Sequence, residues 1–412
     1  MAKKFKIGVM GLVRGRFVLR CAENLSDYME VVAACEIDPA AIEETKKQGI
    51  LPDSVKLYED YDEFINSGLD AVVLCNFFTD HAKCAIKAME AGVAVLSETT
   101  AAPTLGECVE LVEAYERTNT KYMLAANCVF HKVVQAMRNV IDSNRYGTPV
   151  YGDAEYVHPP ETKNAYRERD PKNTHWRDTL PTCYYNMHDL GPMMYITNGI
   201  PRKVVSKAII TPKEVQVGRL RTSDKSFNLV EFDNGMVINY AGATSIGAAG
   251  KWYRVGCQFG TVESERFAEG GNLITCGLNH DKKDPEETRK EEELTWSSCG
   301  ALTPEEEKKF FEGVDIEKLH GGGDLVLLYN FIKYLADEKE PFFDIYHAVA
   351  LSATGIMAWY SALLGSRELE IPDFKDKASR DKVRNDFRTP FAKDVKDVSL
   401  PYRLEDKDKF TL

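Results

Sequence analysis

The chain has 412 residues, of which 44% are hydrophobic and 28% charged, as is typical of a globular protein with two domains. Its net charge of −12 argues against a nucleic-acid-binding surface, and no apolar run approaches the roughly 20 residues that span a bilayer. The first strand starts so close to Met1 that no room remains for a signal peptide, so we expect a cytoplasmic protein with no membrane partner.

The N-terminal segment combines an apolar strand over residues 5–10, a glycine-containing turn over residues 11–15 and a helical stretch to residue 22. Such glycines let the backbone approach a pyrophosphate, and the helix N-terminus offers free N–H groups. A second strand over residues 31–35 ends at Glu36, 25 residues after Gly11 and near the spacing at which a carboxylate accepts both ribose hydroxyls. Val13 stands where G-x-G-x-x-G has its second glycine. We expect NAD to be bound by Gly11, Leu12, Val13, Arg14, Gly15 and Glu36.

Short apolar strands then alternate with helices, with strands over residues 70–75, 93–96 and 121–126. This alternation predicts an α/β fold with a parallel, doubly wound Rossmann sheet, in which ligands bind beyond the carboxyl ends of the strands. That edge also carries Asn76, Glu98 and Asn127. His81, at a helix start, either contacts the nicotinamide or is an ordinary first-turn histidine, and Glu98 either meets the nicotinamide ribose or caps a turn. The further cofactor-binding candidates are Asn76, His81, Glu98 and Thr99.

The pattern changes after a linking helix over residues 133–144. Strands over residues 150–157, 204–210, 228–232, 236–241 and 252–259, with a hairpin turn at 233–235, predict a C-terminal α+β domain with an open antiparallel sheet. We therefore divide the chain into an NAD-binding domain, a substrate domain with a solvated charged insertion, and a tail that wraps a surface or a partner subunit. These parts are residues 1–128, 129–373 (insertion 279–318) and 374–412.

Ten cysteines occur without any C-x-x-C pair. Cys35 and Cys75 end apolar strands, and Cys21, Cys84 and Cys108 lie in helical stretches, which fits buried reduced thiols better than disulfides. A zinc site would need closely spaced ligand pairs, so we expect no metal.

The densest polar cluster spans residues 173–178 and 183–192. If residues 183–191 are helical, Tyr185, His188 and Asp189 share a face, and Pro192 opens the helix locally. A tyrosine beside a histidine can take a proton from a sugar hydroxyl, or the pair can be a buried histidine bonded to a tyrosine hydroxyl.

Three further candidates have a functional and a structural interpretation. Tyr156 and His158 alternate along a strand and point to one face, either as substrate contacts or as ordinary sheet residues. His320 precedes three glycines and Asp324, which suggests either a tight feature near a ligand or a plain helix-entry loop.

These landmarks resemble the Gfo/Idh/MocA oxidoreductase superfamily over about residues 5–373 and, within it, the branch of NAD-dependent α-N-acetylgalactosaminidases. The superfamily's Glu-Lys-Pro has Thr99 in place of lysine, which that branch also lacks, and the branch's sugar-facing glutamate is Ala126 here. The resemblance is carried by residues 98–108, 127–128, 156–158, 175–177, 188–192, 320–324 and 344–348.

The resemblance implies an NAD(H)-dependent oxidoreductase that acts on a sugar or glycoside hydroxyl, at C3, and forms a homo-oligomer through the C-terminal sheet. The alternatives are a redox-neutral glycosidase that oxidises, eliminates, adds water and re-reduces, and a nucleotide-binding regulatory or scaffold protein. The implied catalytic residues are His188, Tyr185 and Tyr156, and the implied substrate-binding residues are His175, Trp176, Arg177, His158, Asn127 and His320.

Overall fold

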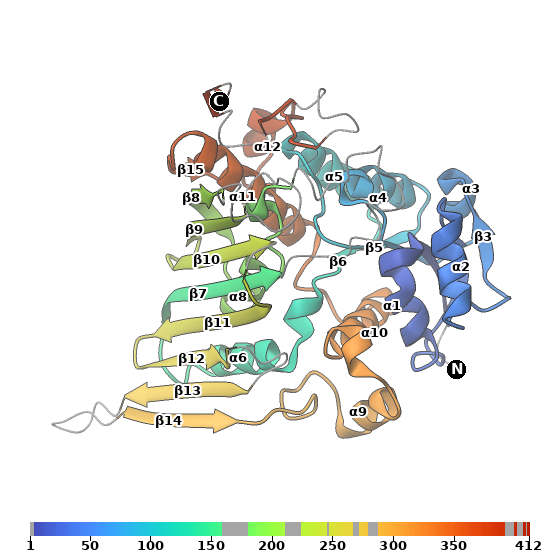
Figure 1. Ribbon diagram of the computed structural model, residues 1–412, viewed down its shortest axis with the longest axis horizontal. Helices are drawn as coiled ribbons and strands as arrows, with labels where there is room; N and C mark the ends of the chain where they lie inside the picture. The colour runs from blue at the N-terminus through green and yellow to red at the C-terminus, as the bar shows by residue number, and fades with distance from the viewer. Residues whose placement is uncertain are drawn as a thin grey trace. The chain divides into compact units, whose positions relative to one another are not determined.

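The computed structural model describes residues 4–158, 180–210, 224–244, 247–266, 272–278, 287–391, 399–401, 407–408 and 410–412. These form two compact units, whose helices and strands are labelled in Figure 1. The first unit comprises Met1–Ala102, Glu107–His131 and Ala301–Val349; the second comprises Pro103–Gly106, Lys132–Gly300 and Ala350–Leu412.

The first unit is built on a six-stranded sheet with the order β3-β2-β1-β4-β5-β6. All neighbouring strands run parallel, which confirms the predicted doubly wound Rossmann sheet. The central strands are apolar runs because both faces of a parallel sheet are covered by helices, and Ile7, Val9 and Val72 are fully buried. The strands are β1 (Phe5–Met10), β2 (Met29–Cys35), β3 (Lys56–Tyr58), β4 (Ala71–Leu74), β5 (Ala94–Ser97) and β6 (Tyr122–Leu124). The helices are α1 (Leu12–Ala22), α2 (Pro39–Lys47), α3 (Tyr61–Ile65), η1 (Phe78–Asp80), α4 (His81–Glu90), α5 (Leu105–Thr118) and η2 (Asn127–Phe130).

Residues 301–349 return to this unit, whereas we had placed them in the substrate domain. The segment forms α9 (Pro304–Phe311), η6 (Ile316–Leu319) and α10 (Gly323–Leu335). Buried Phe310 on α9 meets the rings of Tyr28 and Tyr329, with centroid distances of 6.4 and 4.8 Å. Helix α9 is therefore anchored to the first unit by one apolar side chain, although it lies within the predicted solvated insertion over residues 279–318. Residues 279–286 lie outside the described residues.

The second unit is built on a nine-stranded sheet with the order β14-β13-β12-β11-β7-β10-β9-β8-β15. The neighbouring strands are antiparallel except β7 and β10, which pair in parallel, so the sheet is mixed rather than purely antiparallel as predicted. The strands are β7 (Pro149–His158), β8 (Pro201–Ile209), β9 (Lys225–Phe232), β10 (Val237–Thr244), β11 (Gly250–Cys257), β12 (Gly260–Ser264), β13 (Leu273–Leu278), β14 (Glu287–Glu292) and β15 (Leu369–Glu370).

One face of this sheet is buried and the other is open. Along β9, Ser226, Asn228, Val230 and Phe232 are buried and the residues between them are exposed or half-buried, as the two-residue period of a strand requires. The helices of the unit, which pack on the buried face, are α6 (Lys132–Asp142), α8 (Leu190–Thr197) and α11 (Ile345–Leu363, from residue 350 on). The remaining elements are η4 (Thr182–Tyr184) and α12 (Lys377–Val383).

The described part of the C-terminal tail packs on its own unit. The indole Nε1 of Trp359 on α11 donates to the carbonyl of Pro401 at 2.8 Å, and the ring of Tyr360 lies 5.0 Å from that of Phe410. All ten cysteines are free thiols, eight of them buried. Across the described segments, no helix is both long and apolar enough to cross a membrane.

Candidate functional site

The turn between β1 and α1 is shaped by two glycines of the predicted cofactor loop. Gly11 has φ of 84°, and a Cβ on it would lie 2.6 Å from the carbonyl oxygen of Cys75 at the end of β4. A Cβ on Gly15 would lie 2.5 Å from the side chain of Val9. The backbone therefore passes closer to the sheet than any other residue type allows, and Gly11 at the N-cap has no side chain that could cap α1. This cradle and the backbone N–H groups at the start of α1 fit a dinucleotide pyrophosphate.

Glu36 lies at the carboxyl end of β2, at the same edge of the sheet. Its Oε2 accepts from the backbone N–H of Leu12 at 2.8 Å, and its Oε1 accepts from that of Asp38 at 2.9 Å. These two bonds hold the carboxylate beside the first residue of α1. The remaining lone pairs of the carboxylate fit the ribose hydroxyls of a dinucleotide.

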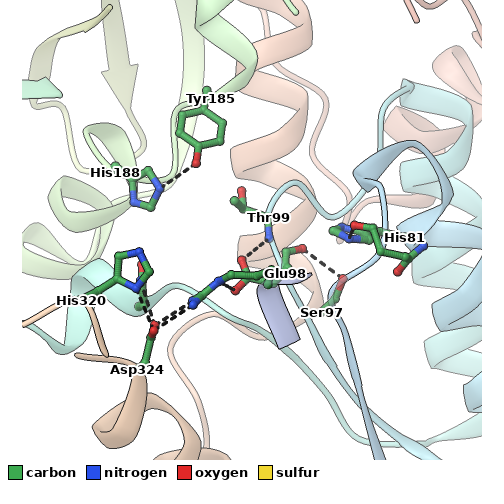
Figure 2. A network of polar contacts seen from close by, with 11 residues as sticks. His81, Ser97, Glu98, Thr99, Tyr185, His188, His320 and Asp324 are labelled. Carbon is green, nitrogen blue, oxygen red and sulfur yellow. Dashed lines mark hydrogen bonds and ion pairs between the residues drawn. The ribbon is translucent and has the colours of Figure 1, made fainter. Parts of the chain in front are cut away.

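Arg14 forms ion pairs with two carboxylates of the first unit, Glu98 and Asp324. Both carboxylates are labelled in Figure 2. The Arg14 guanidinium donates to both carboxylate oxygens of Asp324 at 2.7 and 2.8 Å and, through Nε, to Glu98 at 2.7 Å. Burial alone would raise the pKa of Asp324, but Arg14 holds it well below its usual range. Because three of its N–H donors bond carboxylates and these neutralise its charge, Arg14 fixes the loop in place rather than offering a free cation to a pyrophosphate.

Asp324 collects two further donors. The Nδ2 of Asn127 lies 3.0 Å from its Oδ1, and the Nδ1 of His320 lies 2.8 Å from its Oδ2. Asn127 is only 4% exposed, and its amide donates a hydrogen bond to Asp324. The sequence suggested instead that Asn127 contacts the substrate. We did not predict Asp324 as a site residue; the Gly-Gly-Gly-Asp at the start of α10 was its only signal.

His81, Glu98 and Thr99 lie together at the ends of β4 and β5. His81 is 1% exposed, and its ring nitrogens lie 3.0 Å from the carbonyl oxygen of Thr100 and 3.1 Å from that of Asn76. Burial lowers the pKa of His81, although both carbonyl contacts act in the opposite direction. This geometry supports the structural interpretation of His81, which positions the Glu98–Thr100 turn. Thr99 donates its backbone N–H to Glu98 at 3.3 Å.

The second unit gathers aromatic and imidazole rings on the buried side of β7. The ring of Tyr156 lies 4.6 Å from that of His188, and the ring of Tyr185 lies 5.1 Å from that of His188. The Tyr185 hydroxyl and the His188 Nε2 are 3.4 Å apart. His158 lies 6.3 Å from Tyr156, and all four side chains are half-buried. The structure thus brings these four residues together.

Tyr185 and His188 meet in a turn, so the expected helix over residues 183–191 was wrong. Within the described residues 180–189, only 182–184 are helical. Helix α8 then begins at Leu190, whose backbone N–H donates to the carboxylate of Asp189 at 2.7 Å. Pro192 is the third residue of α8. A backbone N–H at this position would have no partner within the helix, so proline is tolerated there. Asp189 is buried. Tyr253, which we did not predict, donates its hydroxyl to the carbonyl of His188 at 2.7 Å. Expected sites His175, Trp176 and Arg177 lie outside the described residues.

Comparison with known proteins identifies the first unit. Residues 5–126 match the family model described as "Oxidoreductase family, NAD-binding Rossmann fold", the Gfo/Idh/MocA family. These residues are an NAD-binding Rossmann domain of the Gfo/Idh/MocA oxidoreductase family. For these residues the match confirms the family and the cofactor predicted from the sequence.

Other known proteins are similar to this chain over most of its length. A glycosyl hydrolase family 109 protein from Shewanella pealeana is 24% identical over 386 residues, which are 84% of this chain and 80% of the relative. An α-N-acetylgalactosaminidase from Tannerella forsythia is 22% identical over 422 residues, covering 88% and 86%. The solved structure of levoglucosan dehydrogenase with NADH superposes with a TM-score of 0.72 at 14% identity, covering 90% of this chain and 100% of that one, and thus shares its fold.

Proposed function

We propose that the protein is an NAD(H)-dependent oxidoreductase that acts on a sugar or glycoside hydroxyl, at C3. The observation that carries this proposal is the pair formed by the Tyr185 hydroxyl and the His188 imidazole, 3.4 Å apart and half-buried, in a chain with an NAD-binding domain. Oxidation of a hydroxyl requires a hydride acceptor and a base for the hydroxyl proton. NAD accepts the hydride when bound, and Tyr185 or His188 takes the proton.

The surrounding rings suit a sugar. Tyr156, Tyr185 and His188 present apolar ring faces with polar tips, a combination that packs on the C–H faces of a pyranose and bonds its hydroxyls. The bond from Tyr253 to the backbone of His188 fixes the turn that carries the base. In this proposal Tyr156, His158, His175, Trp176 and Arg177 position the substrate.

The reaction is tested by incubating the enzyme with NAD and a panel of free sugars and nitrophenyl glycosides. NADH absorbance and released nitrophenol are followed together. A dehydrogenase forms NADH in proportion to oxidised sugar. Binding of NAD without turnover of any panel member would contradict the proposal and would favour a nucleotide-binding regulatory protein.

Two substitutions test the acid/base pair. We expect Tyr185→Phe and His188→Ala to bind NAD normally and to lower kcat by about 10²-fold or more, because proton transfer loses its positioned acceptor. The matched control is Tyr151→Phe, since Tyr151 is an exposed tyrosine of β7 that points to the face opposite Tyr156. Near-normal turnover in both site variants would make the pair structural.

A redox-neutral glycosidase is the second candidate, favoured by the names of the curated relatives. In that reaction hydride returns to the sugar after the aglycone has been eliminated and water added. The branch of NAD-dependent α-N-acetylgalactosaminidases has a sugar-facing glutamate where this chain has Ala126, which is 1% exposed. Alanine offers no carboxylate, so we rank this candidate second. Nitrophenol release without accumulating NADH would reverse the order.

We further propose a homo-oligomer formed through the open face of the nine-stranded sheet, defined here by the outward side chains of β7, β8, β9 and β10. Large apolar side chains on this face are between 43% and 51% exposed. Clusters of this kind mark protein interfaces. These residues are Tyr151, Ile209, Phe227, Leu229 and Val237.

A further inference from the structure

Asp324 is a buried carboxylate that reaches the NAD-binding domain from outside the residues matched by the family model. The match covers residues 5–126, whereas Asp324 belongs to residues 301–349, which return to the first unit. Its side chain is 0% exposed. Burying an ionised carboxylate is costly unless partners compensate it, so the contacts of Asp324 indicate what the returning segment does.

The main partner of Asp324 is Arg14 in the cofactor loop, defined here as residues 11–15. The Nη1 of Arg14 donates to Oδ2 of Asp324 at 2.8 Å, and its Nη2 donates to Oδ1 at 2.7 Å. Figure 2 draws these contacts at Asp324. Two parallel bonds between a guanidinium and a carboxylate fix the direction of the pair as well as its distance. Asp324 therefore holds the first turn of α1, in which Arg14 is the third residue.

Two further contacts restrain the Arg14 side chain. Its Nε donates to Glu98, which directly follows β5, at 2.7 Å. Its guanidinium also lies 4.2 Å from the ring centroid of Phe17, which is 1% exposed. The guanidinium is thus held by the end of β5, the start of α10 and its own helix, which fixes the backbone of the cofactor loop at Arg14.

Asp324 is itself held by groups other than Arg14. The Nδ2 of Asn127 donates to Oδ1 of Asp324 at 3.0 Å, and the Nδ1 of His320 lies 2.8 Å from Oδ2. Residues 320–322 have φ values between 49° and 90°, and this left-handed path leads directly into α10, whose first turn carries Asp324. The carboxylate is therefore a preformed acceptor for Arg14.

The cofactor loop needs such restraint because of how a pyrophosphate is bound. The ligand contacts backbone N–H groups of the glycine turn and of the helix N-terminus that follows it, so the site exists only in one backbone conformation. Gly11, with φ of 84°, gives the loop the freedom to leave that conformation. A loop that is fixed before the ligand arrives avoids the ordering cost of binding.

We propose that Asp324 is a positioning residue of the NAD-binding site, which acts through Arg14 and holds the cofactor loop in the conformation that binds the pyrophosphate. The returning segment thereby completes a site whose matched residues end at position 126. All groups involved belong to the first unit. The effect concerns NAD binding and does not depend on the substrate that is oxidised.

Binding titrations with three ligands test this role. NAD and ADP-ribose contain the pyrophosphate, whereas adenosine has the adenine and the ribose without it. We expect Asp324→Asn to raise the Kd of NAD and of ADP-ribose by about tenfold or more, because the loop then has to be ordered on binding. The Kd of adenosine should stay unchanged. The control is Asp337→Asn, which removes an ion pair with Lys121 just beyond the opposite end of α10 and should alter none of the three Kd values.

Variants of Arg14 test whether Asp324 acts through it. Arg14→Gln should weaken NAD and ADP-ribose as Asp324→Asn does, and the double variant should lose no more than either single variant, because both remove the same pair of bonds. Arg14→Lys keeps a cation between the two carboxylates, which preserves the fold, but it lacks the planar fork that bonds both oxygens of Asp324. We expect it to weaken the two pyrophosphate ligands and to leave adenosine unchanged.

The pattern across ligands separates positioning from a purely structural role. Wild-type NAD binding by Asp324→Asn and Arg14→Lys would overturn the proposal. Loss of adenosine binding together with ADP-ribose binding, or losses that multiply in the double variant, would overturn it as well, since a general destabilisation of the unit gives these results. A loss confined to the pyrophosphate ligands and shared by the variants of Asp324 and Arg14 supports it.

Discussion

The clearest residue-scale consequence concerns Glu36 and the choice of cofactor. Its carboxylate is fixed by the backbone N–H groups of Leu12 and Asp38, and the residues that follow it (Ile37, Asp38 and Pro39) include no cation. A 2′-phosphate at this position would meet a negative charge without a counter-ion. We expect calorimetry to show NAD binding about tenfold or more tighter than NADP, since about 1 kcal/mol of repulsion at contact distance already approaches that ratio.

Glu36→Gln separates charge from shape in the same measurement. The amide oxygen can still accept a backbone N–H, while the repulsion toward a 2′-phosphate disappears. We expect the preference for NAD to fall without loss of NAD binding. Equal binding of NAD and NADP by the wild-type protein would show that Glu36 does not face the ribose.

Asp189 makes a residue-scale prediction about stability and pH. Burial raises the pKa of Asp189 from 3.8 to about 7, and its Oδ2 has no hydrogen-bond partner within the described residues. Because the folded-state pKa is raised, its contribution to stability is present below about pH 4 and is lost as the pH rises through about 7. The difference corresponds to at most about 4 kcal/mol.

Asp189→Asn tests this prediction, because it removes the titration and keeps a side-chain oxygen to accept the N–H of Leu190. We expect the variant to gain free energy of unfolding relative to the wild type at pH 8, and to gain much less at pH 4. Denaturant unfolding at both pH values measures this difference. A gain that does not depend on pH would mean that Asp189 is solvated or paired in solution.

Sequence reasoning found residues whose role depends on local order and missed those whose role depends on distant partners. Gly11 and Glu36 were predictable because strand, turn, helix and second strand follow one another within a short stretch. Asp324 was not, since its partner Arg14 lies 310 positions away and only the fold brings them together. Tyr185 and His188 were paired correctly because a three-residue separation brings side chains together in a turn as well as in a helix.

At the scale of elements, α9 is a helix with mostly charged side chains that carries one fully buried phenylalanine. Three glutamates and two lysines, at positions 305–309, predict solvation of the segment, yet Phe310 follows them and is fully buried against Tyr28 and Tyr329. A capping box between Thr303 and Glu306 starts the helix and directs this side chain inward. One apolar position among charges does not give a periodic pattern, so the sequence alone did not reveal it.

Phe310→Ala measures the contribution of this anchor. We expect the first unit to lose about 3–5 kcal/mol of unfolding free energy, which is typical of a buried phenylalanine replaced by alanine. Phe311→Ala on the same helix is the control, because Phe311 is half-buried and should cost clearly less. Denaturant midpoints of the two variants give the comparison. Equal losses would show that α9 is not anchored through Phe310.

At the scale of the whole molecule, the sequence predicted both sheet types but not the path of the chain between units. Alternating strands and helices fix a parallel sheet locally, and short turns fix antiparallel neighbours. The parallel pairing of β7 with β10 and the return of residues 301–349 to the first unit join segments far apart in sequence. Contacts of that kind leave no periodic signal in the chain.

The open face of the nine-stranded sheet leads to a prediction about assembly. Leu229 and Phe227 are 51% and 43% exposed and lie on β9, which has a neighbouring strand on each side. The cross-strand register places Val205 and Asn239 beside Leu229. Covering such a patch with the same patch of a second copy removes apolar surface from water on both chains.

We therefore expect light scattering coupled to size exclusion to give a mass of at least two chains for the wild-type protein. Leu229→Glu places a charge in the middle of the proposed interface, so its mass should fall to that of one chain at micromolar concentration. Ile316→Glu is the matched control, because Ile316 is 40% exposed on η6 in the other unit and should leave the mass unchanged. A wild-type protein that elutes as a single chain, or a Leu229→Glu variant that stays assembled, would exclude the open face as the interface.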